Sequence, residues 1–332
     1  MLHCYYIQSL VLDNMMNNSF EQLEQLTSQL GIEQKCFLIN LLKGQIAGQN
    51  CLDVLTLHQD KAANCPHCHS HTIKRNGKVN ARQRYLCKSC HKSFMVTYNT
   101  PFYRLRSPEK WTNYLCCMLR SLTVRSSARD SDITKNTAFL WRHRFLSLLN
   151  IQSGTHLSGI VEMDETLFRY LEKGSRNLTR KAHKRGKDKA GRGRAKGDWV
   201  AVLVARDRQQ QTFDKRLESA SGESLFELLN AHIDKDSVIC SDGFRSYGVL
   251  AKKLGVNHKP SNLTKGIRVI EKVFHIQNVN SYHGRLHSWM KRFHGVATKY
   301  LDNYLSWFRF FESNEKPNEN NLLLAQTQLI GT

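Results

Sequence analysis

The chain of 332 residues lacks long apolar runs. No stretch approaches the roughly eighteen to twenty uninterrupted apolar residues that a membrane-spanning helix needs, so we expect no membrane span. Its beginning also lacks the basic start and apolar core of a secretory or transit signal, because Asp13 comes before any long apolar run. These absences argue against a membrane or secreted protein and favour a cytoplasmic one.

Acidic residues are scarce in comparison with basic ones. The chain holds 28 Asp and Glu against 49 Lys and Arg, which gives a formal net charge of +21. This excess predicts a phosphate-rich partner, because each phosphate that a cation neutralises releases counterions. A merely basic soluble protein is the alternative. Apolar residues still make up 40% of the chain, which is enough for packed cores and excludes a disordered polycation. The length favours two or three domains.

Ten cysteines are present, and four of them form two CxxC pairs. Cys65 and Cys68 precede Cys87 and Cys90, with eighteen residues between the pairs. Thiolates are preferred zinc ligands, and two close pairs brought together by a hairpin form a closed Cys4 site, which is structural rather than catalytic. We therefore predict a Zn²⁺-binding zinc ribbon over residues 62–100. The other cysteines are scattered in apolar surroundings, which is typical of buried free thiols in a reducing cytoplasm.

The segment between the two cysteine pairs is basic. Its Asn76-Gly77 dipeptide is a strong signal for a hairpin turn, and a short strand over residues 84–86 is expected to deliver the second pair. The basic side chains of these strands are suited to contact DNA phosphates: Lys74, Arg75, Lys78, Arg82 and Arg84. The alternative is that zinc only replaces a core too small to fold alone.

Helical patterns lie on both sides of the predicted ribbon. Residues 1–60 are expected to form a helical N-terminal region in which no chemistry is evident. Residues 105–150 predict two or three helices, in a pattern compatible with a DNA-binding helix-turn-helix. In that arrangement one set of side chains would face the duplex: Lys135, Asn136, Arg142, His143 and Arg144. Many small helical bundles show the same pattern, so a structural role is the alternative.

From residue 158 the pattern changes to alternating strands and helices. The order of three strands, a helix, a strand and a helix predicts an α/β domain with a mixed sheet. One apolar strand ends at Asp164 and another at Asp242. If these strands are neighbours, the two carboxylates converge at one sheet edge, where a hard cation such as Mg²⁺ or Mn²⁺ offsets their repulsion. For Asp242 alone, an Asp-Gly turn that ends a strand is the alternative.

A third group is expected from an amphipathic helix that begins near Val279. Its second face carries polar and basic side chains at helical spacing: Asn280, His283, His287, Lys291 and His294. A solvated polar face is the alternative. The spacing of His283 and His287 also suits zinc, but no HExxH pattern accompanies them, which argues against that interpretation.

Taken together, these motifs resemble those of insertion-sequence transposases of the DDE superfamily, in the group with an N-terminal zinc ribbon. The resemblance extends over roughly residues 60–312 and rests on the two cysteine pairs and on the stretches 137–145, 162–166, 241–243, 278–283 and 293–305. It implies an RNase H-like catalytic domain over residues 158–312 that uses two divalent ions to cleave DNA and to transfer the freed 3′-hydroxyls. It also implies a prokaryotic, nucleoid-associated protein that acts on double-stranded DNA as a homodimer or larger assembly.

The resemblance also implies roles for single residues. Asp164 and Asp242 match the first two metal ligands, and Asn280 matches the third. The third position is usually Glu in the superfamily and is Asn in some zinc-ribbon members. Because the Asn carbonyl is neutral, it binds Mg²⁺ more weakly, and His283 is an alternative third ligand. Members often carry Lys or Arg seven residues after the third ligand, a place that His287 holds here.

A strongly basic segment follows the first strand of the predicted catalytic domain. Lys173–Lys196 contains eleven Lys or Arg, one acid and four glycines, a composition that cannot form a core. We expect a basic loop over residues 173–197 that clamps the DNA backbone through side chains such as Lys184 and Arg185, with Lys291 contributing from the later helix. The alternative is a solvated insertion. Residues 313–332 are expected to be a C-terminal tail.

Three functions are compatible with these features. The leading hypothesis is a DNA transposase. The departures at Asn280 and His287 leave a second hypothesis, a zinc-ribbon DNA-binding regulator derived from a transposase that no longer cleaves DNA. An RNA-directed nuclease is the third, because the implied fold would allow it.

Overall fold

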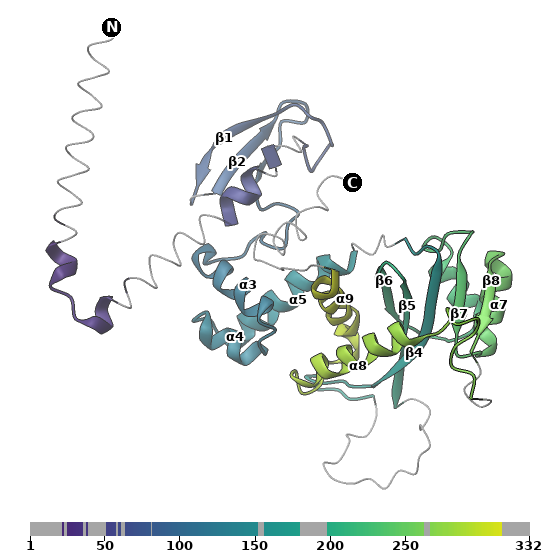
Figure 1. Cartoon of the computed structure of the whole chain (residues 1–332). Coiled ribbons are helices and arrows are strands. Elements are labelled where there is room, and N and C mark those ends of the chain that lie inside the picture. The colour runs from purple at the N-terminus through teal and green to yellow at the C-terminus, as the bar shows by residue number, and fades with distance from the viewer. Residues whose placement is uncertain are drawn as a thin grey trace.

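The computed structural model describes residues 22, 25–35, 38, 51–57, 59–60, 64–80, 82–151, 156–179, 198–261 and 266–313. Most of the predicted N-terminal helical region and nearly all of the predicted tail lie outside these ranges. The described chain contains a small three-stranded sheet, a group of helices, and a five-stranded mixed sheet with helices on both faces (Figure 1). The mixed α/β architecture predicted for the second half is therefore confirmed.

The small antiparallel sheet holds the cysteine pairs. Its strands are β1 (Ile73–Val79), β2 (Arg82–Cys87) and β3 (Ser93–Met95), in that order. The Asn76-Gly77 dipeptide lies within β1, where the register shifts between Arg75 and Lys78 and Gly77 has a φ of 70°. The left-handed glycine thus serves a β-bulge rather than the turn. The predicted turn position is wrong, because β1 continues to Val79 before the chain reverses.

A group of helices follows the small sheet. It consists of the 3-10 helix η1 (Pro108–Lys110) and of α3 (Trp111–Leu119), α4 (Val124–Asp130) and α5 (Lys135–Ile151). The Thr123 hydroxyl accepts the Ser126 N–H and caps α4, and Thr134 accepts the Thr137 N–H in the same way at the start of α5. α5 packs against α9 (Leu301–Ser313) near the C-terminus.

The large sheet has the strand order β6-β5-β4-β7-β8. Its strands are β4 (Ile160–Arg169), β5 (Trp199–Asp207), β6 (Thr212–Arg216), β7 (Val238–Ser241) and β8 (Asn257–Pro260). The neighbouring strands β4 and β5, and likewise β5 and β6, are antiparallel, whereas β7 runs parallel to both β4 and β8. β7 ends at Ser241, whereas its parallel neighbour β4 continues to Arg169 and stays paired with β5 over that length. The prediction that this strand ends at Asp164 is therefore wrong, because the longer neighbour β5 extends β4 past the point where β7 stops.

Two apolar cores cover the faces of the large sheet. α6 (Gly222–Leu229) and α7 (Arg245–Leu254) pack on one face, together with Val161 and Met163 of β4. α8 (Gln277–Lys291), the 3-10 helix η3 (Thr298–Tyr300) and α9 lie on the other face (Figure 1). Because successive strand residues point to opposite faces, the even-numbered side chains of β4 face α8.

Within the described ranges, no helix has both the length and the apolar character that crossing a membrane requires. No disulfide joins the cysteines of those ranges.

Candidate functional site

The four sulfur atoms of the CxxC pairs converge, and all of them lie within 4.8 Å of one another. The distance is 3.7 Å between the sulfurs of Cys65 and Cys90, and 3.6 Å between those of Cys68 and Cys87. Tetrahedral zinc with Zn–S bonds of about 2.3 Å separates its sulfurs by about 3.8 Å. The backbone N–H of His67 and that of Cys90 also point at sulfurs of the cluster, each at 3.5 Å. The donor set therefore fits zinc.

Asp164 lies in the middle of β4, beside the point where β7 stops, and Asp242 directly follows β7; we call this part of the sheet the carboxylate edge. In the parallel register of β4 and β7, Glu162 is opposite Cys240, and each of the two aspartates lies two residues further along its chain. Neighbouring strands are about 4.8 Å apart, and the charge of Asp242 acts on the pKa of Asp164, so the two carboxyl groups are close enough to interact. Burial, and then the charge of Asp242, raise the pKa of Asp164 to about 7. This edge therefore favours a bound cation, which relieves both costs.

The helix α8 runs along β4 and brings two histidines to this strand. His283 Nδ1 lies 3.9 Å from Asp164 Oδ2. One turn later, His287 Nε2 forms a 2.7 Å hydrogen bond with Thr166 Oγ1, and its ring stacks on Phe168 with centroids 4.5 Å apart. The structure thus brings His283 to the carboxylates, while His287 is fixed further along the strand.

The two candidates for the third ligand differ in their surroundings. Asn280 is exposed and lies one turn before His283 on the same face of α8. His283 is only 9% exposed, and burial together with the charge of His287 lowers its pKa to about 4, so its imidazole is neutral at pH 7. A neutral imidazole nitrogen can bind a metal. Accessibility favours Asn280, whereas the distance to Asp164 favours His283.

The start of α8 is held by Glu162, whose role the sequence interpretation missed. This fully buried carboxylate accepts the backbone N–H of Asn278 at 2.8 Å and that of Val279 at 3.1 Å. It also lies 3.0 Å from the Arg208 guanidinium and 3.3 Å from His275 Nδ1. A negative charge is favourable at a helix N-terminus. An acid inside an apolar strand, on the same face as Asp164, was the available signal.

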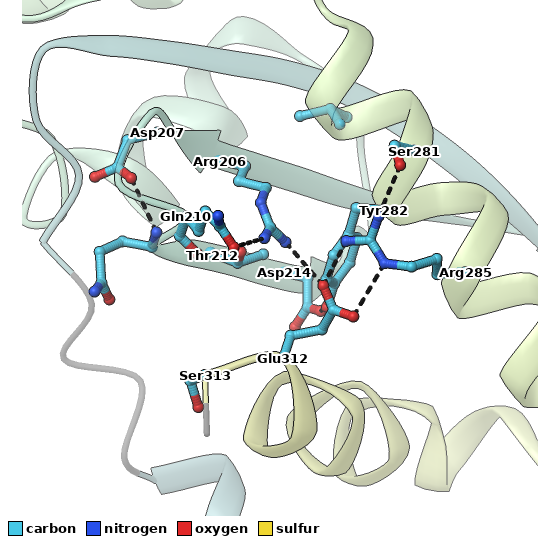
Figure 2. Close-up of polar contacts among 12 residues, drawn as sticks. Arg206, Asp207, Gln210, Thr212, Asp214, Ser281, Tyr282, Arg285, Glu312 and Ser313 are labelled. Atoms are coloured by element: carbon cyan, nitrogen blue, oxygen red, sulfur yellow. Dashed lines mark hydrogen bonds and ion pairs between the residues drawn. The ribbon is translucent and has the colours of Figure 1, made fainter. Parts of the chain in front are cut away.

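A second polar network anchors α8 from its other side (Figure 2). The Tyr282 hydroxyl donates a 2.5 Å hydrogen bond to the buried carboxylate of Asp214 on β6. Glu312 of α9 accepts a 3.0 Å hydrogen bond from Arg285 of α8 and lies 3.3 Å from Arg206 of β5. These contacts fix the rotation of α8, and therefore decide which of its side chains face Asp164.

The described start of the basic segment 173–197 is attached close to the end of α8. The Lys173 ammonium donates hydrogen bonds to the carbonyls of His294 at 3.1 Å and Gly295 at 2.9 Å. The Leu171 N–H and Thr298 Oγ1 form a 2.9 Å hydrogen bond beside them. Lys184 and Arg185, predicted to contact DNA, lie outside the described residues.

The other cations predicted to bind DNA fall into two groups. Lys74, Arg75 and Lys291 are exposed, although Arg75 forms an ion pair with Asp60. Their contact with DNA stays a prediction.

Four arginines of the predicted set are directed inward. Arg82, Arg84 and Arg144 are half-buried, and each donates a hydrogen bond to a main-chain carbonyl. Arg142 is fully buried; its guanidinium donates to a main-chain carbonyl at 2.8 Å and lies 4.7 Å from the centre of the Trp307 ring. The prediction that Arg142 faces DNA is therefore wrong, because its charge is used inside the helical core.

Comparisons with known proteins found a matching transposase family and two similar proteins. Residues 156–312 match the family model of the ISXO2-like transposase domain. The match confirms the resemblance to insertion-sequence transposases of the DDE superfamily. An uncharacterised protein in the transposable element ISH50 of Halobacterium salinarum is 28% identical over 248 residues, which cover 74% of this chain and 83% of that protein. A crystal structure of a pre-cleavage Mos1 transpososome covers 68% of this chain and 78% of its own, at 11% identity and a TM-score of 0.29.

Proposed function

We propose that this chain is a transposase that binds the ends of an insertion element, cleaves DNA there and transfers the freed strands to a target. The proposal is carried by the meeting of Asp164, Asp242 and α8 inside the segment that matches a transposase domain. The mixed sheet with helices on both faces supports an RNase H-like domain over residues 158–312.

The donor sets fit two kinds of metal. Asp164 and Asp242 would hold Mg²⁺ or Mn²⁺, with Asn280 as the third ligand and His283 as its alternative. Ions bound there supply Lewis acidity for the attacking and leaving oxygens of the phosphodiester. The Cys4 cluster would hold structural Zn²⁺ and thereby complete a zinc ribbon.

The protein's own residues orient and bind in this proposal. Glu162 fixes the N-terminus of α8, so that the third ligand comes from the face of the helix that is turned toward Asp164. Lys291, exposed in the last turn of α8, and the basic segment 173–197 bind the DNA backbone. Because two element ends must be held together, the working form is a homodimer or larger assembly.

A cleavage assay on a short duplex that carries the element end tests the proposal. Asp164→Asn and Asp242→Asn are expected to lower Mg²⁺-dependent nicking at least about 10³-fold, because each removes a charged ligand, while DNA binding stays within about threefold. The matched control is Asp236→Asn, an exposed acid before the other end of β7, which should cut normally. Normal nicking by both Asp164→Asn and Asp242→Asn would show that the reaction takes place elsewhere.

The third ligand is decided by separate variants. Asn280→Ala is expected to slow cleavage and Asn280→Glu to restore or increase it, because Glu supplies the missing charge. If neither change has an effect and His283→Ala abolishes cleavage, His283 is the ligand.

The runner-up is a DNA-binding regulator that no longer cleaves. The exposed, neutral Asn280 favours this second function, since no carboxylate occupies the position of the third metal ligand. Tight binding of the element end, with no nicking in either Mg²⁺ or Mn²⁺ under any condition of salt and pH, would select it.

A further inference from the structure

The outer face of α5 carries large apolar side chains that the fold does not bury. Ala138, Trp141 and Phe145 form the inner face and are at most 4% exposed. Leu140, in contrast, is 65% exposed and Phe139 is 40% exposed. These two side chains follow one another on an open helix face, so they are available for contact with a partner.

Polar and basic groups surround this apolar patch. Lys135 and Asn136 lie one turn before it on the same face of α5, and both are exposed. Phe139 is held in place by ring contacts, with its centroid 4.4 Å from that of His143 and 5.7 Å from that of Tyr300. The face therefore combines a fixed aromatic ring, an open aliphatic side chain, an amide and a cation.

A groove next to the start of α5 adds positive charge. It encloses about 690 Å³ between residues 104–107 and the turn that joins α4 to α5, and Arg104 and Arg106 line it. Its lining contains one acid, Asp132, which already lies 2.9 Å from the Lys110 ammonium. Such a groove is complementary to a polyanion, so it favours nucleic acid over an apolar protein surface as the occupant.

The kind of base follows from the side chains on the helix face. An Asn amide pairs with the N7 and N6 groups of adenine in the major groove, and apolar side chains contact the methyl group of thymine. Guanine is most often read by Arg or Lys. The two arginines of α5, Arg142 and Arg144, are directed inward, which leaves Lys135 as the cation of this face. The amide of Asn136 and the apolar side chains of Phe139 and Leu140 match A·T base pairs.

We propose that α5 enters the major groove of the element end and reads A·T pairs, with Asn136 on adenine and with Leu140 and Phe139 on thymine methyl groups. Arg104 and Arg106 hold the adjacent phosphates. This inference rests on the proposed function, because it requires that the chain bind the element end.

Replacing single thymines by deoxyuridine in the element-end duplex tests the inference, since this change removes only the methyl group. At one or two positions, deoxyuridine is expected to weaken binding by the full-length protein about three- to tenfold. Leu140→Ala should weaken binding to the thymine duplex by a similar factor and should no longer respond to deoxyuridine at that position. Ile267→Ala, at an apolar site that is 45% exposed on another surface, is the matched control and should respond like the wild type.

Variants of Asn136 and Arg104 provide two further independent tests. Asn136→Ala should lose its sensitivity to 7-deazaadenine at a neighbouring position. Arg104→Gln should weaken binding to all sequences equally and reduce the salt dependence by about one phosphate contact. Because Leu140 is largely exposed, its variant is expected to keep the wild-type circular dichroism spectrum and melting temperature.

The outcomes separate the two proposals. If the wild type binds the element end but no deoxyuridine substitution changes its affinity, or if Leu140→Ala responds as the wild type does, α5 does not read thymine and only this inference fails. If Leu140→Ala binds DNA normally but changes the oligomeric state in light scattering, the patch is a protein contact and the inference is overturned. If the wild type does not bind the element end at all, the proposed function fails with it.

Discussion

The cysteine cluster and the carboxylate edge are assembled in opposite ways. Residues 65–90 supply all four thiols from one short hairpin. Asp164, Asp242 and His283 come from two strands and a helix that are distant in sequence, and strand pairing and helix packing bring them together. With zinc bound as proposed, the local site would take the metal as its core. The site built by the fold instead buries a carboxyl group, and burial raises the pKa of Asp164 to about 7.

The largest expected difference between the two sites is the response of the fold to zinc removal. If Zn²⁺ is the core of the small sheet, a chelator or Cys87→Ser should unfold residues 64–100, because structural zinc contributes about 10 kcal/mol or more to such modules. Hydrogen exchange should show amides of β1 and β2 becoming unprotected while those of β4 and β5 stay protected. Protected β2 amides after chelation would show that the sheet folds without metal.

The carboxylate edge should depend instead on remote supports such as Glu162. Glu162→Gln leaves the Arg208 charge without its partner, and we expect a loss of about 3 kcal/mol in the free energy of unfolding of the α/β domain. Cleavage should fall with it, because the start of α8 is released. Urea unfolding and nicking rates measure both effects, with Glu227→Gln on the exposed side of α6 as control. Unchanged stability would mean that other contacts fix the helix.

The raised pKa of Asp164 should make the free energy of unfolding of the metal-free protein depend on pH. The pKa of Asp164 is about 7 in the fold against 3.8 when unperturbed, so the native state favours the proton, and wild-type stability falls as the pH rises between these values. Asp164→Asn escapes this loss and should be about 2 kcal/mol more stable than the wild type at pH 8, after allowance for partial solvent exposure, with no gain near pH 3.

Thermal unfolding across this pH range checks the prediction. Adding Mg²⁺ should stabilise the wild type at pH 8 but leave the variant nearly unchanged. A constant difference between the two proteins at every pH would contradict a titration of Asp164.

The smallest expected effect concerns the other side of α8. Tyr282→Phe removes one hydrogen bond to the buried Asp214 carboxylate and should cost about 1–2 kcal/mol. Denaturant unfolding measures this loss. Phe308→Leu, a ring neighbour of Tyr282 without polar contacts to Asp214, serves as a packing control. A Tyr282→Phe variant as stable as the wild type would show that the Asp214 contact does not anchor the helix.

The parts of the fold that could be predicted are those set by short-range patterns. The CxxC spacing predicts the cysteine cluster because close pairs on one hairpin must meet. The apolar runs before Asp164 and Asp242 predict that the two acids lie close together if their strands are neighbours, and β4 and β7 are neighbours, although β4 continues past Asp164 to Arg169. The mixed sheet follows from the order of the elements.

The rest depended on partners that are far away in sequence. Arg142 reads as a DNA contact on a basic helix, but its burial is compensated by Trp307, a residue of a distant helix. Glu162 reads as one more polar residue in a strand until α8 places its backbone N–H groups against it. The Asn76-Gly77 signal correctly predicts a left-handed glycine, but a bulge and a turn both satisfy it. Whether Asn280 or His283 is the third ligand also depends on how α8 is rotated.

The attachment of Lys173 to the carbonyls that follow α8 has a mechanical consequence. If the segment 173–197 binds DNA as proposed, its anchor at Lys173 connects that contact to the end of the helix that carries His283. A displacement of the bound DNA would then be passed through these hydrogen bonds to the helix.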